Sequence, residues 1–249
     1  MQKSTIIRLN QLNHDFYSKT APYFARSREF YWQGWLRLEP YFRRHTKLSV
    51  LDIGCGSARF AEFLYDAFPK TQIGYQGVDA NSDLLKIASD KLRPLQGLHG
   101  SVSQVDIISQ LESGFDPLPN DHFDVIALMG ILHHVPSLEL RRKLIETATQ
   151  KLAPQGFLFM SFWQPHRFSR YTAKLISPES VEIDPQELEP GDCFLPWDRG
   201  EHAVRYVHSS SDLEISSLTK DLKLKLMAEF RADGRSQREN QYILLQNSV

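Results

Sequence analysis

A pair of glycines stands where a strand-like segment of this chain gives way to a helix-like one. The apolar run from residue 48 to residue 53 has the pattern of a buried strand, Gly54 and Gly56 follow it, and helical periodicity begins at Arg59. Glycine lets the backbone turn sharply and approach a ligand with no Cβ in between. In α/β sheets such a bend lies at the carboxyl ends of the strands, where ligands bind. The segment therefore predicts a strand, turn and helix with a ligand site at the bend.

Strand-like and helix-like segments alternate through the middle of the chain. The predicted strands are residues 48–53, 72–79, 97–105, 123–129 and 157–162, and the predicted helices are residues 59–68, 84–93 and 139–151. A helix at 211–218 and strands at 222–230 and 242–246 complete the pattern with an antiparallel hairpin. Alternation of this kind predicts a Rossmann-like α/β fold, with a doubly wound, mostly parallel, seven-stranded sheet.

Two segments fall outside this rhythm. Residues 1–47 are helix-like and rich in aromatic side chains, a pattern that fits either core packing or a lid over a ligand site. Residues 164–205 are interrupted by prolines and are expected to form an insertion beside the site or a plain surface loop. The 249 residues divide most simply into an N-terminal helical lid segment, 1–47, and one α/β domain, 48–249, that carries the insertion.

Charge and composition exclude several classes of protein. The formal net charge is −1, so the molecule as a whole does not attract polyanions, although basic residues cluster locally, as at 141–143. Cys55 and Cys193 are far apart and no histidine stands at zinc-ligand spacing from them, so we expect neither a disulfide framework nor a metal site. No stretch approaches the roughly 18 apolar residues of a membrane-spanning helix. The N-terminus also lacks the apolar core of a signal peptide, so the expected location is the cytoplasm.

An acidic residue at the end of the second predicted strand adds to the glycine signal. A Gly-x-Gly pair alone is weak, because a tight structural turn explains it equally well. The dinucleotide fingerprint needs a third glycine, but Ala58 and Arg59 stand in its place, which disfavours a nicotinamide cofactor. Asp79 lies where a carboxylate accepts both hydroxyls of a ribose. The bend and Asp79 together predict a cofactor that contains a ribose.

These residues resemble the motifs of class I S-adenosylmethionine-dependent methyltransferases. Leu51–Gly56 is similar to the glycine motif of that family, and Asp79 is similar to its ribose-binding acid. Further motifs follow in order at residues 106–107, 123–126, 132–134 and 152–156, with Gln155 in place of the first glycine of the family's Leu-x-Pro-Gly-Gly turn. The resemblance implies a methyltransferase domain with S-adenosylmethionine as cofactor. The cofactor-binding residues that it implies are Asp52, Gly54, Cys55, Gly56, Asp79, Ala80, Asp106, Ile107 and Met129.

Methyl transfer from a sulfonium demands little chemistry from the protein. The sulfonium is already a strong methyl donor, so the protein mainly aligns the lone pair of the acceptor with the methyl–sulfur bond and excludes water. No metal ion and no nucleophilic side chain are required, and none is evident in the sequence. The residues around the acceptor should therefore serve for binding and orientation.

The flanking segments resemble the tRNA wobble-uridine methyltransferases, which esterify a carboxymethyl group on the modified base. The similar segments are Phe16–Arg28, Gly191–Trp197, Arg205–His208 and Asn240–Tyr242. The resemblance implies tRNA as the acceptor and, as in eukaryotic members of the family, a small activating protein subunit as partner. At residues 241–242 Gln and Tyr stand where the family has a Trp. This departure and the lack of strong basic character leave the acceptor open.

A carboxylate acceptor is ionised at neutral pH and needs no general base, so its site needs a cation and a shaped pocket. Arg28 and Arg205 are candidates to pair with it. His133 follows the fourth strand and is a candidate to face the reaction, although neighbouring side chains such as His133 and His134 seldom both point inward. The candidates for catalytic positioning are Arg28, His133 and Arg205, and those for contacts with the acceptor are Tyr23, Trp163, Trp197, Tyr206 and His208. Each also has a plain interpretation as a surface arginine, a core aromatic or a structural histidine.

Two other functions remain open from the sequence. The same core supports a small-molecule O- or N-methyltransferase, because a fold does not determine its substrate. A non-catalytic module could also keep the cofactor fold as an interaction platform. The intact Gly54, Gly56 and Asp79 argue against that module.

Overall fold

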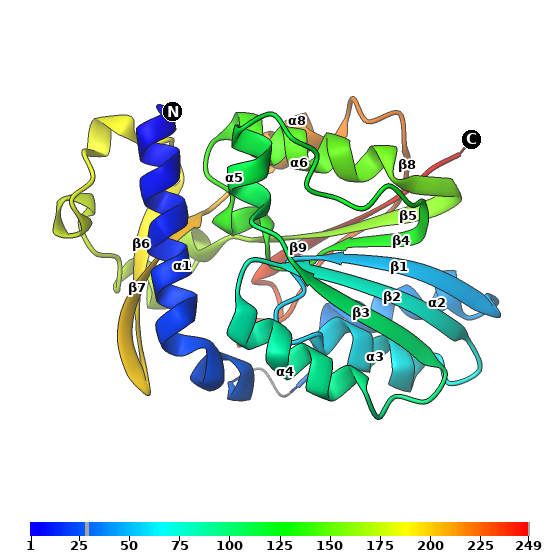
Figure 1. Cartoon of the computed structure of the whole chain (residues 1–249). Helices are drawn as coiled ribbons and strands as arrows, with labels where there is room; N and C mark the ends of the chain where they lie inside the picture. The colour runs from blue at the N-terminus through cyan, green and yellow to red at the C-terminus, as the bar shows by residue number, and fades with distance from the viewer. Residues whose placement is uncertain (28–29, 249) are drawn as a thin grey trace.

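The computed structural model describes residues 1–27 and 30–248 and is built around one twisted seven-stranded sheet (Figure 1). Its strand order is β3-β2-β1-β4-β5-β9-β8, with β1 to β5 parallel and β9 antiparallel to both of its neighbours. The strands are β1 (Lys47–Ile53), β2 (Gln72–Asp79), β3 (Leu98–Gln104), β4 (Phe123–Leu128), β5 (Leu152–Trp163), β8 (Lys225–Ala232) and β9 (Asn240–Gln246). The predicted doubly wound sheet and its C-terminal antiparallel hairpin are confirmed.

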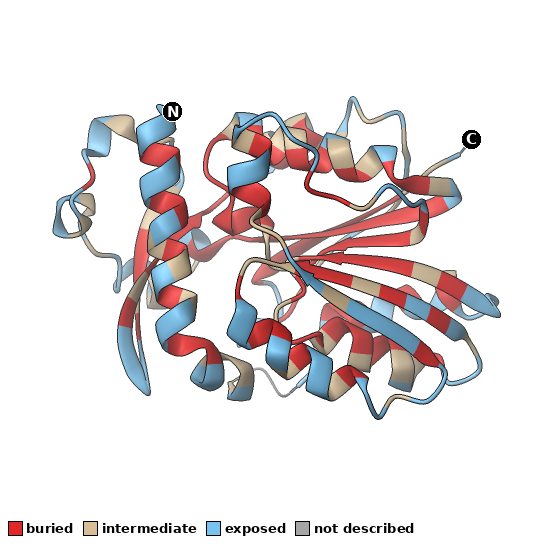
Figure 2. Ribbon diagram, viewed as in Figure 1, coloured by how far each residue is buried: buried red, intermediate tan, exposed pale blue. Residues whose placement is uncertain are grey.

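Helices cover both faces of the sheet, as Figure 1 shows. One face carries α2 (Glu39–Phe42), α3 (Arg59–Ala67), α4 (Ser82–Leu92) and the 3-10 helix η1 (Gln33–Leu38), and the other carries α5 (Ile107–Glu112), α6 (Leu138–Gln150) and α8 (Asp212–Thr219). Side chains alternate between faces along a strand, so Val50 of β1 packs in the first core whereas Leu51 packs in the second. The inner strands β1, β4, β5 and β9 are accordingly buried along most of their length, whereas the edge strands β3 and β8 are mostly exposed or half-buried (Figure 2).

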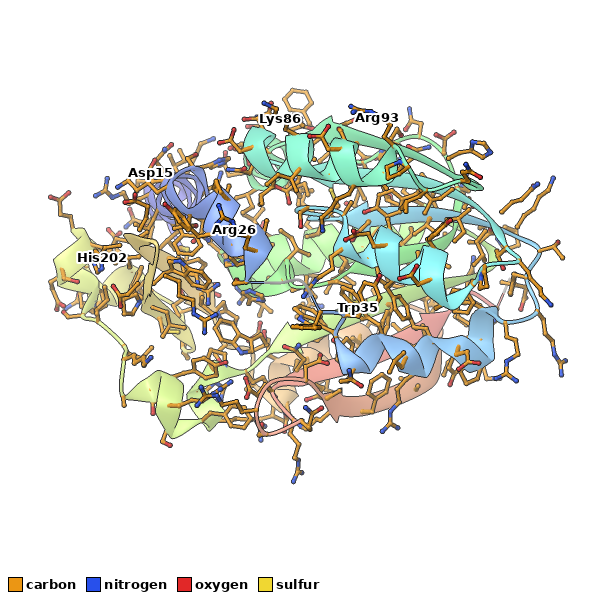
Figure 3. All side chains as sticks on the ribbon, turned by 90° about the horizontal axis from the view of Figure 1, so that it is seen from below. Asp15, Arg26, Trp35, Lys86, Arg93 and His202 are labelled. Atoms are coloured by element: carbon orange, nitrogen blue, oxygen red, sulfur yellow. The ribbon has the colours of Figure 1, made fainter. Side chains whose placement is uncertain are left out.

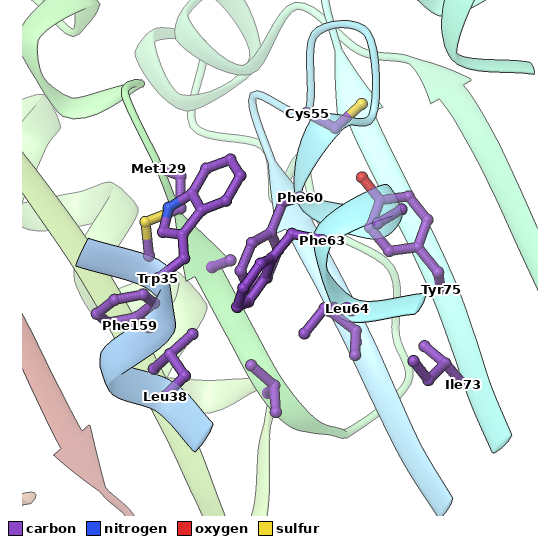
Figure 4. Close-up of a cluster of buried hydrophobic side chains, with 14 of the residues drawn as sticks. Trp35, Leu38, Cys55, Phe60, Phe63, Leu64, Ile73, Tyr75, Met129 and Phe159 are labelled. Carbon is purple, nitrogen blue, oxygen red and sulfur yellow. The ribbon is translucent and has the colours of Figure 1, made fainter. Parts of the chain in front are cut away.

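The N-terminal aromatic residues contribute to the core beneath α3. Trp35 of η1 is almost fully buried and its ring lies 5.2 Å from that of Phe60 and 5.6 Å from that of Phe63, measured between centroids (Figure 4). In the view of Figure 3, Trp35 lies inside the molecule, while Lys86 of α4 and Arg93, which directly follows that helix, lie at the outer surface. For Trp35 the structure therefore supports the core interpretation of the aromatic pattern.

A long N-terminal helix and a separate hairpin stand together at one end of the sheet. The helix α1 (Lys3–Arg26) packs along the two-stranded sheet of β6 (Asp192–Arg199) and β7 (Glu201–His208), as Figure 1 shows. Short helices lead from β5 to this hairpin: η3 (Pro165–Arg167), α7 (Ser169–Thr172), η4 (Pro178–Val181) and η5 (Pro185–Glu187). The segment predicted as an insertion at 164–205 thus contains a hairpin, which continues to His208.

Local chemistry explains where elements begin and where the sheet is irregular. Asn81 caps α4 because its side chain accepts a hydrogen bond of 2.9 Å from the backbone N–H of Leu84. The predicted turn at 152–156 is instead an irregular start of β5. A Cβ at Gly156 would lie 2.9 Å from the carbonyl oxygens of Ala153 and Phe123, so the close approach of these backbones requires glycine.

Among the described residues, the structure has neither a membrane-spanning helix nor a cluster of metal ligands. Within 1–27 and 30–248, no helix has the length and apolar character needed to cross a membrane. In the same part of the chain, no three His, Cys, Asp or Glu side chains gather as a metal site would require.

Candidate active site

A cavity of about 1240 Å³ opens between the carboxyl ends of the strands, α1 and the β6–β7 hairpin. Every residue that the resemblance implied for the cofactor lines it: Asp52, Gly54, Cys55, Gly56, Asp79, Ala80, Asp106, Ile107 and Met129. Trp163, Trp197, His133 and Arg205, which the sequence suggested for the acceptor, line the same cavity. The two groups of residues therefore share one space.

The bend between β1 and α3 exposes backbone to this cavity. Both glycines have a left-handed backbone conformation, with φ of 74° at Gly54 and 53° at Gly56. The N–H groups of Gly54 and Cys55 donate to the carbonyl oxygen of Val78 at 2.8 and 3.1 Å, which ties the bend to β2. A Cβ at Gly54 would lie 2.8 Å from Cβ of Ile131, whereas a Cβ at Gly56 would meet nothing within 4 Å. The missing side chain at Gly54 thus lets Ile131 pack against the backbone, and the missing side chain at Gly56 leaves room for a ligand.

The carboxylate of Asp79 stands beside this bend. One of its oxygens accepts a hydrogen bond from the N–H of Gly56 and the other accepts one from the N–H of Asn81, both at 2.9 Å. Burial raises the pKa of Asp79, and the two backbone N–H groups oppose that shift. Each carboxylate oxygen has a further lone pair. Asp79 can therefore accept hydroxyl donors from a ribose while it holds the bend in place.

Asp52 borders the cavity, but its carboxylate is bonded within the protein. It is 2% exposed and accepts a hydrogen bond of 2.7 Å from the hydroxyl of Tyr75. Burial raises its pKa to about 7, against the effect of the Tyr75 hydrogen bond. This interaction fixes the end of β1 to β2 directly before the glycine bend.

Helix α1 closes the edge of the cavity through Asp106. This carboxylate caps α5 by accepting from the N–H of Ser109 at 3.0 Å, and it also accepts from Nδ2 of Asn10 at 3.1 Å and faces Nε2 of His14 at 3.0 Å. Burial alone would raise the pKa of Asp106, but the hydrogen bonds from His14 and Ser109 hold it well below its usual range. The same contact with Asp106 raises the pKa of His14. The cavity edge therefore carries an ion pair between two elements distant in sequence.

Three of the α1 residues at this edge, Asn10, Asn13 and His14, were missed from the sequence, whereas Tyr17 was considered as a residue that closes over the cofactor or packs within the helix. Asn10, Asn13, His14 and Tyr17 all line the cavity. Residues three and four apart lie on one face of a helix. The spacing of these polar side chains within a helix-like segment was the available signal.

Arg205 of β7 lies buried among aromatic rings. It is 8% exposed, and its guanidinium carbon lies 5.0 Å from the ring centroid of Trp163, 5.5 Å from Phe16 and 5.9 Å from Trp197. Within the described part of the chain its side chain forms no salt bridge, and its Nε has no hydrogen-bond partner. A buried charge without a counter-charge is costly, so this position is suited to an anionic ligand.

Two neighbouring histidines both line the cavity, which corrects the expectation that only one of them would face inward. They lie on the 3-10 helix η2 (Leu132–His134), whose tight turn brings the rings of His133 and His134 to 4.2 Å between centroids. Nε2 of His134 lies 2.8 Å from the hydroxyl of Tyr17, and its Nδ1 lies 3.2 Å from the carbonyl oxygen of Tyr206. Burial, with a contribution from Arg205, lowers the pKa of His134 to about 3. His134 is therefore neutral and connects α1 with β7.

Some suggested acceptor residues lie away from the cavity lining. Tyr206 and His208 are fully buried on the opposite face of β7 from Arg205, because side chains alternate along a strand. Tyr23 is partly exposed near the end of α1, where its ring lies against Gly200. Arg28 lies outside the described residues. Trp163, Trp197, Arg205 and His133 are thus the acceptor candidates that the structure brings together.

The donor half of the cavity has the features that an adenosyl donor requires. Gly56 offers backbone with open space above it, and Asp79 offers a carboxylate for a ribose. Ile107 and Met129 supply apolar wall beside these groups. S-adenosylmethionine fits these residues, and among the described residues no feature of this half calls for a metal.

Comparisons with known proteins agree with this geometry. The profile of a family described as "Methyltransferase domain" matches residues 19–214. The "Probable tRNA methyltransferase 9B" of Mus musculus is 25% identical over 187 residues, which cover 75% of this chain and 33% of that protein. The "tRNA (carboxymethyluridine(34)-5-O)-methyltransferase" of Arabidopsis thaliana is 24% identical over 179 residues, which cover 72% of this chain and 39% of that protein.

Solved structures show the same fold. An S-adenosylmethionine-dependent methyltransferase from Clostridium acetobutylicum has a TM-score of 0.62 at 15% identity, with 94% of this chain and 92% of that chain covered. This likeness concerns the fold alone. The chain spans about a third of the length of the Mus musculus relative and 39% of that of the Arabidopsis thaliana relative.

Proposed function

This chain belongs to the methyltransferase-domain family, has the fold of S-adenosylmethionine-dependent methyltransferases, and on that premise we propose that it esterifies a carboxymethyl group on the wobble uridine of tRNA. S-adenosylmethionine supplies an activated methyl group. Gly56 and Asp79 hold the donor, Asp106 borders it, and Arg205 binds the carboxylate of the acceptor.

The observation that carries this proposal is the environment of Arg205. A guanidinium offers a planar fork of donors that matches a carboxylate in bidentate geometry. Here that group is buried and has no carboxylate partner among residues 1–27 and 30–248, while it lines the same cavity as Gly56 and Asp79. An anionic acceptor would neutralise it. A neutral acceptor would leave the buried charge uncompensated.

The aromatic rings around Arg205 suit a base. Trp163 and Trp197 both line the cavity, and each is about nine-tenths buried, with 9% and 8% exposed. Stacking of a base on an aromatic side chain contributes about 1–3 kcal/mol. The cavity of about 1240 Å³ exceeds the range of about 300–1,000 Å³ for a single small ligand. It thus has room for a donor and a nucleotide together.

The reaction needs no proton transfer from the protein. A carboxylate acceptor is ionised at neutral pH, and His134 is neutral, with its pKa near 3. His134 instead holds Tyr17 and β7 in place, and the rings of Trp163 and Trp197 exclude water from the region of Arg205. The protein contributes binding, orientation and a dry site.

The printed names of the relatives support the choice of acceptor. The Arabidopsis thaliana relative is named for methylation of carboxymethyluridine at position 34 of tRNA, and the Mus musculus relative for tRNA methylation. The family resemblance implies a small activating protein subunit, so its presence belongs among the conditions to be tested.

The test measures transfer of labelled methyl groups from S-adenosylmethionine to tRNA, with the modified nucleosides identified by mass spectrometry. Arg205→Met should lower transfer by about 30-fold or more, since loss of one partner of a buried charge pair costs about 2–5 kcal/mol, and donor affinity should stay within about twofold. Arg93→Met, at the outer surface directly after α4, is the matched control. Each protein is assayed alone and with an extract that supplies a partner subunit.

The outcomes separate the candidate functions. If the Arg205→Met variant transferred methyl groups to tRNA at the wild-type rate, the assignment of the acceptor site would be contradicted. Transfer to metabolites that persists after ribonuclease treatment would indicate the small-molecule O- or N-methyltransferase. Donor binding with no transfer under any condition would indicate a non-catalytic module.

A further inference from the structure

A buried polar network lies at the root of the β6–β7 hairpin, on the face away from the cavity. His208 of β7 is 1% exposed, and its Nδ1 lies 2.7 Å from Oδ1 of Asp192 while its Nε2 lies 2.8 Å from Oε2 of Glu214. Oδ1 of Asp192 also accepts a hydrogen bond of 2.7 Å from the hydroxyl of Tyr206. The network thus joins both strands of the hairpin to α8.

The second half of this network joins the hairpin to α6. Arg141 of α6 is 1% exposed and donates at 2.8 Å to both Glu214 and Glu189. Its Nη1 donates at 3.0 Å to the carbonyl oxygen of Val135, which directly follows η2. Arg141 therefore connects the polar network around His208 with the turn that carries His133 and His134.

The geometry fixes the protonation state of His208. An ionised carboxylate only accepts hydrogen bonds, so a ring whose two nitrogens both face carboxylates must donate from both. With both carboxylates ionised, that ring is an imidazolium. The charged groups that act on it are Asp192 of β6, Glu214 of α8 and Arg141 of α6. Tyr206 of β7 donates to the same oxygen of Asp192, and His166 of η3 lies close enough for the charge of His208 to lower its pKa. The two carboxylates raise the pKa of His208 against the effects of burial and of Arg141.

Arg205 and His208 occupy opposite faces of one short strand. Arg205 points to the aromatic rings in the cavity, and His208 points to the anchor. Because the strand is stiff and side chains alternate, a shift of the anchored face moves the cavity face with it.

We propose that His208, hydrogen-bonded through both ring nitrogens, is a positioning residue that anchors β7 and thereby holds Arg205 in the acceptor half of the cavity. The role in acceptor binding rests on the proposed function, whereas the anchoring of the hairpin does not. His208 touches neither donor nor acceptor. It acts through Arg205.

The test compares His208→Gln with His202→Gln. Both residues lie on β7 and face an aspartate, but His202 is exposed and, among the residues that the structure describes, its one salt bridge is with Asp198. Gln carries both of its donors on one amide nitrogen, so a carbonyl oxygen replaces the second donor of the ring and faces one of the two carboxylates. We expect His208→Gln to raise hydrogen exchange of the β6–β7 amides about tenfold and the KM for the acceptor about tenfold, with kcat and donor affinity within about twofold. His202→Gln should behave as the wild type.

A second measurement uses the wild-type protein. Nuclear magnetic resonance of the histidine rings should show His208 losing its proton at a pH above that of an unperturbed histidine, with hairpin exchange, corrected for its intrinsic pH dependence, rising at the same midpoint. This readout holds even if His208→Gln fails to fold. It also survives failure of the tRNA proposal, because it needs no acceptor.

The results that would overturn the proposal are equally specific. Unchanged hairpin exchange in His208→Gln would show that His208 is no anchor. A parallel loss of donor affinity would show a general loss of structure. A His208 ring that is neutral at pH 7 would remove the double hydrogen bond on which the proposal depends.

Discussion

Replacement of Gly56 by alanine tests whether the glycine bend receives the donor. An added Cβ would meet no atom within 4 Å, so the methyl group clashes with nothing in the protein. The left-handed backbone, with φ of 53°, costs an alanine about 1–2 kcal/mol of stability. If the donor passes over this residue, the methyl group occupies part of its space. A tenfold to hundredfold loss of affinity, about 1.4–2.8 kcal/mol, is the expected result.

Gly114→Ala is the matched control for this variant. Gly114 also has a left-handed backbone, with φ of 85°, and a Cβ there would likewise meet nothing within 4 Å, but it does not line the cavity. Both variants should lose a similar amount of unfolding free energy, measured with denaturant. Only Gly56→Ala should lose affinity for S-adenosylmethionine, measured by calorimetric titration. Donor binding by Gly56→Ala at the wild-type level would refute the assignment of the bend.

Two further predictions concern carboxylates of the donor half. Asp79→Ala removes the acceptor for the N–H groups of Gly56 and Asn81, and should abolish detectable donor binding in the same titration; normal binding would overturn the ribose assignment. The partly exposed His14–Asp106 pair should contribute about 0–1 kcal/mol, measured as the difference in unfolding free energy between wild type and His14→Gln across pH. Because the pKa of His14 is raised in the folded protein, its contribution to the unfolding free energy is complete below pH 6.5 and is lost as pH rises through the folded pKa. Because the pKa of Asp106 is lowered, its contribution is present above pH 3.8 and is lost as pH falls below that value. A difference that does not change with pH would refute the pair.

The donor half of the cavity could be predicted from the sequence because its residues are local in the chain. A parallel sheet places the carboxyl end of each strand at the same edge. Gly54 and Gly56 follow β1, Asp79 ends β2 and Met129 follows β4, so strand order alone brings them together. The contact between His14 and Asp106, by contrast, joins residues 92 positions apart. The polar spacing in α1 indicates one face of a helix, but it does not specify that this face meets Asp106.

The environment of Arg205 could be predicted less fully, because the sequence does not show which side chains of β7 face the cavity. From the sequence, Arg205, Tyr206 and His208 are all candidates to contact the acceptor. In the structure, Arg205 lies in the cavity, whereas Tyr206 and His208 lie in the buried polar network on the other face of β7. A shift by one residue would exchange these faces. It would place His208 against the aromatic rings and remove the guanidinium from the cavity. The partners that exclude this shift, Asp192 and Glu214, come from two other elements, so the division could not be derived from β7 alone. The buried charges around His208 therefore favour the observed register, and the register determines which side chain of the segment lines the cavity.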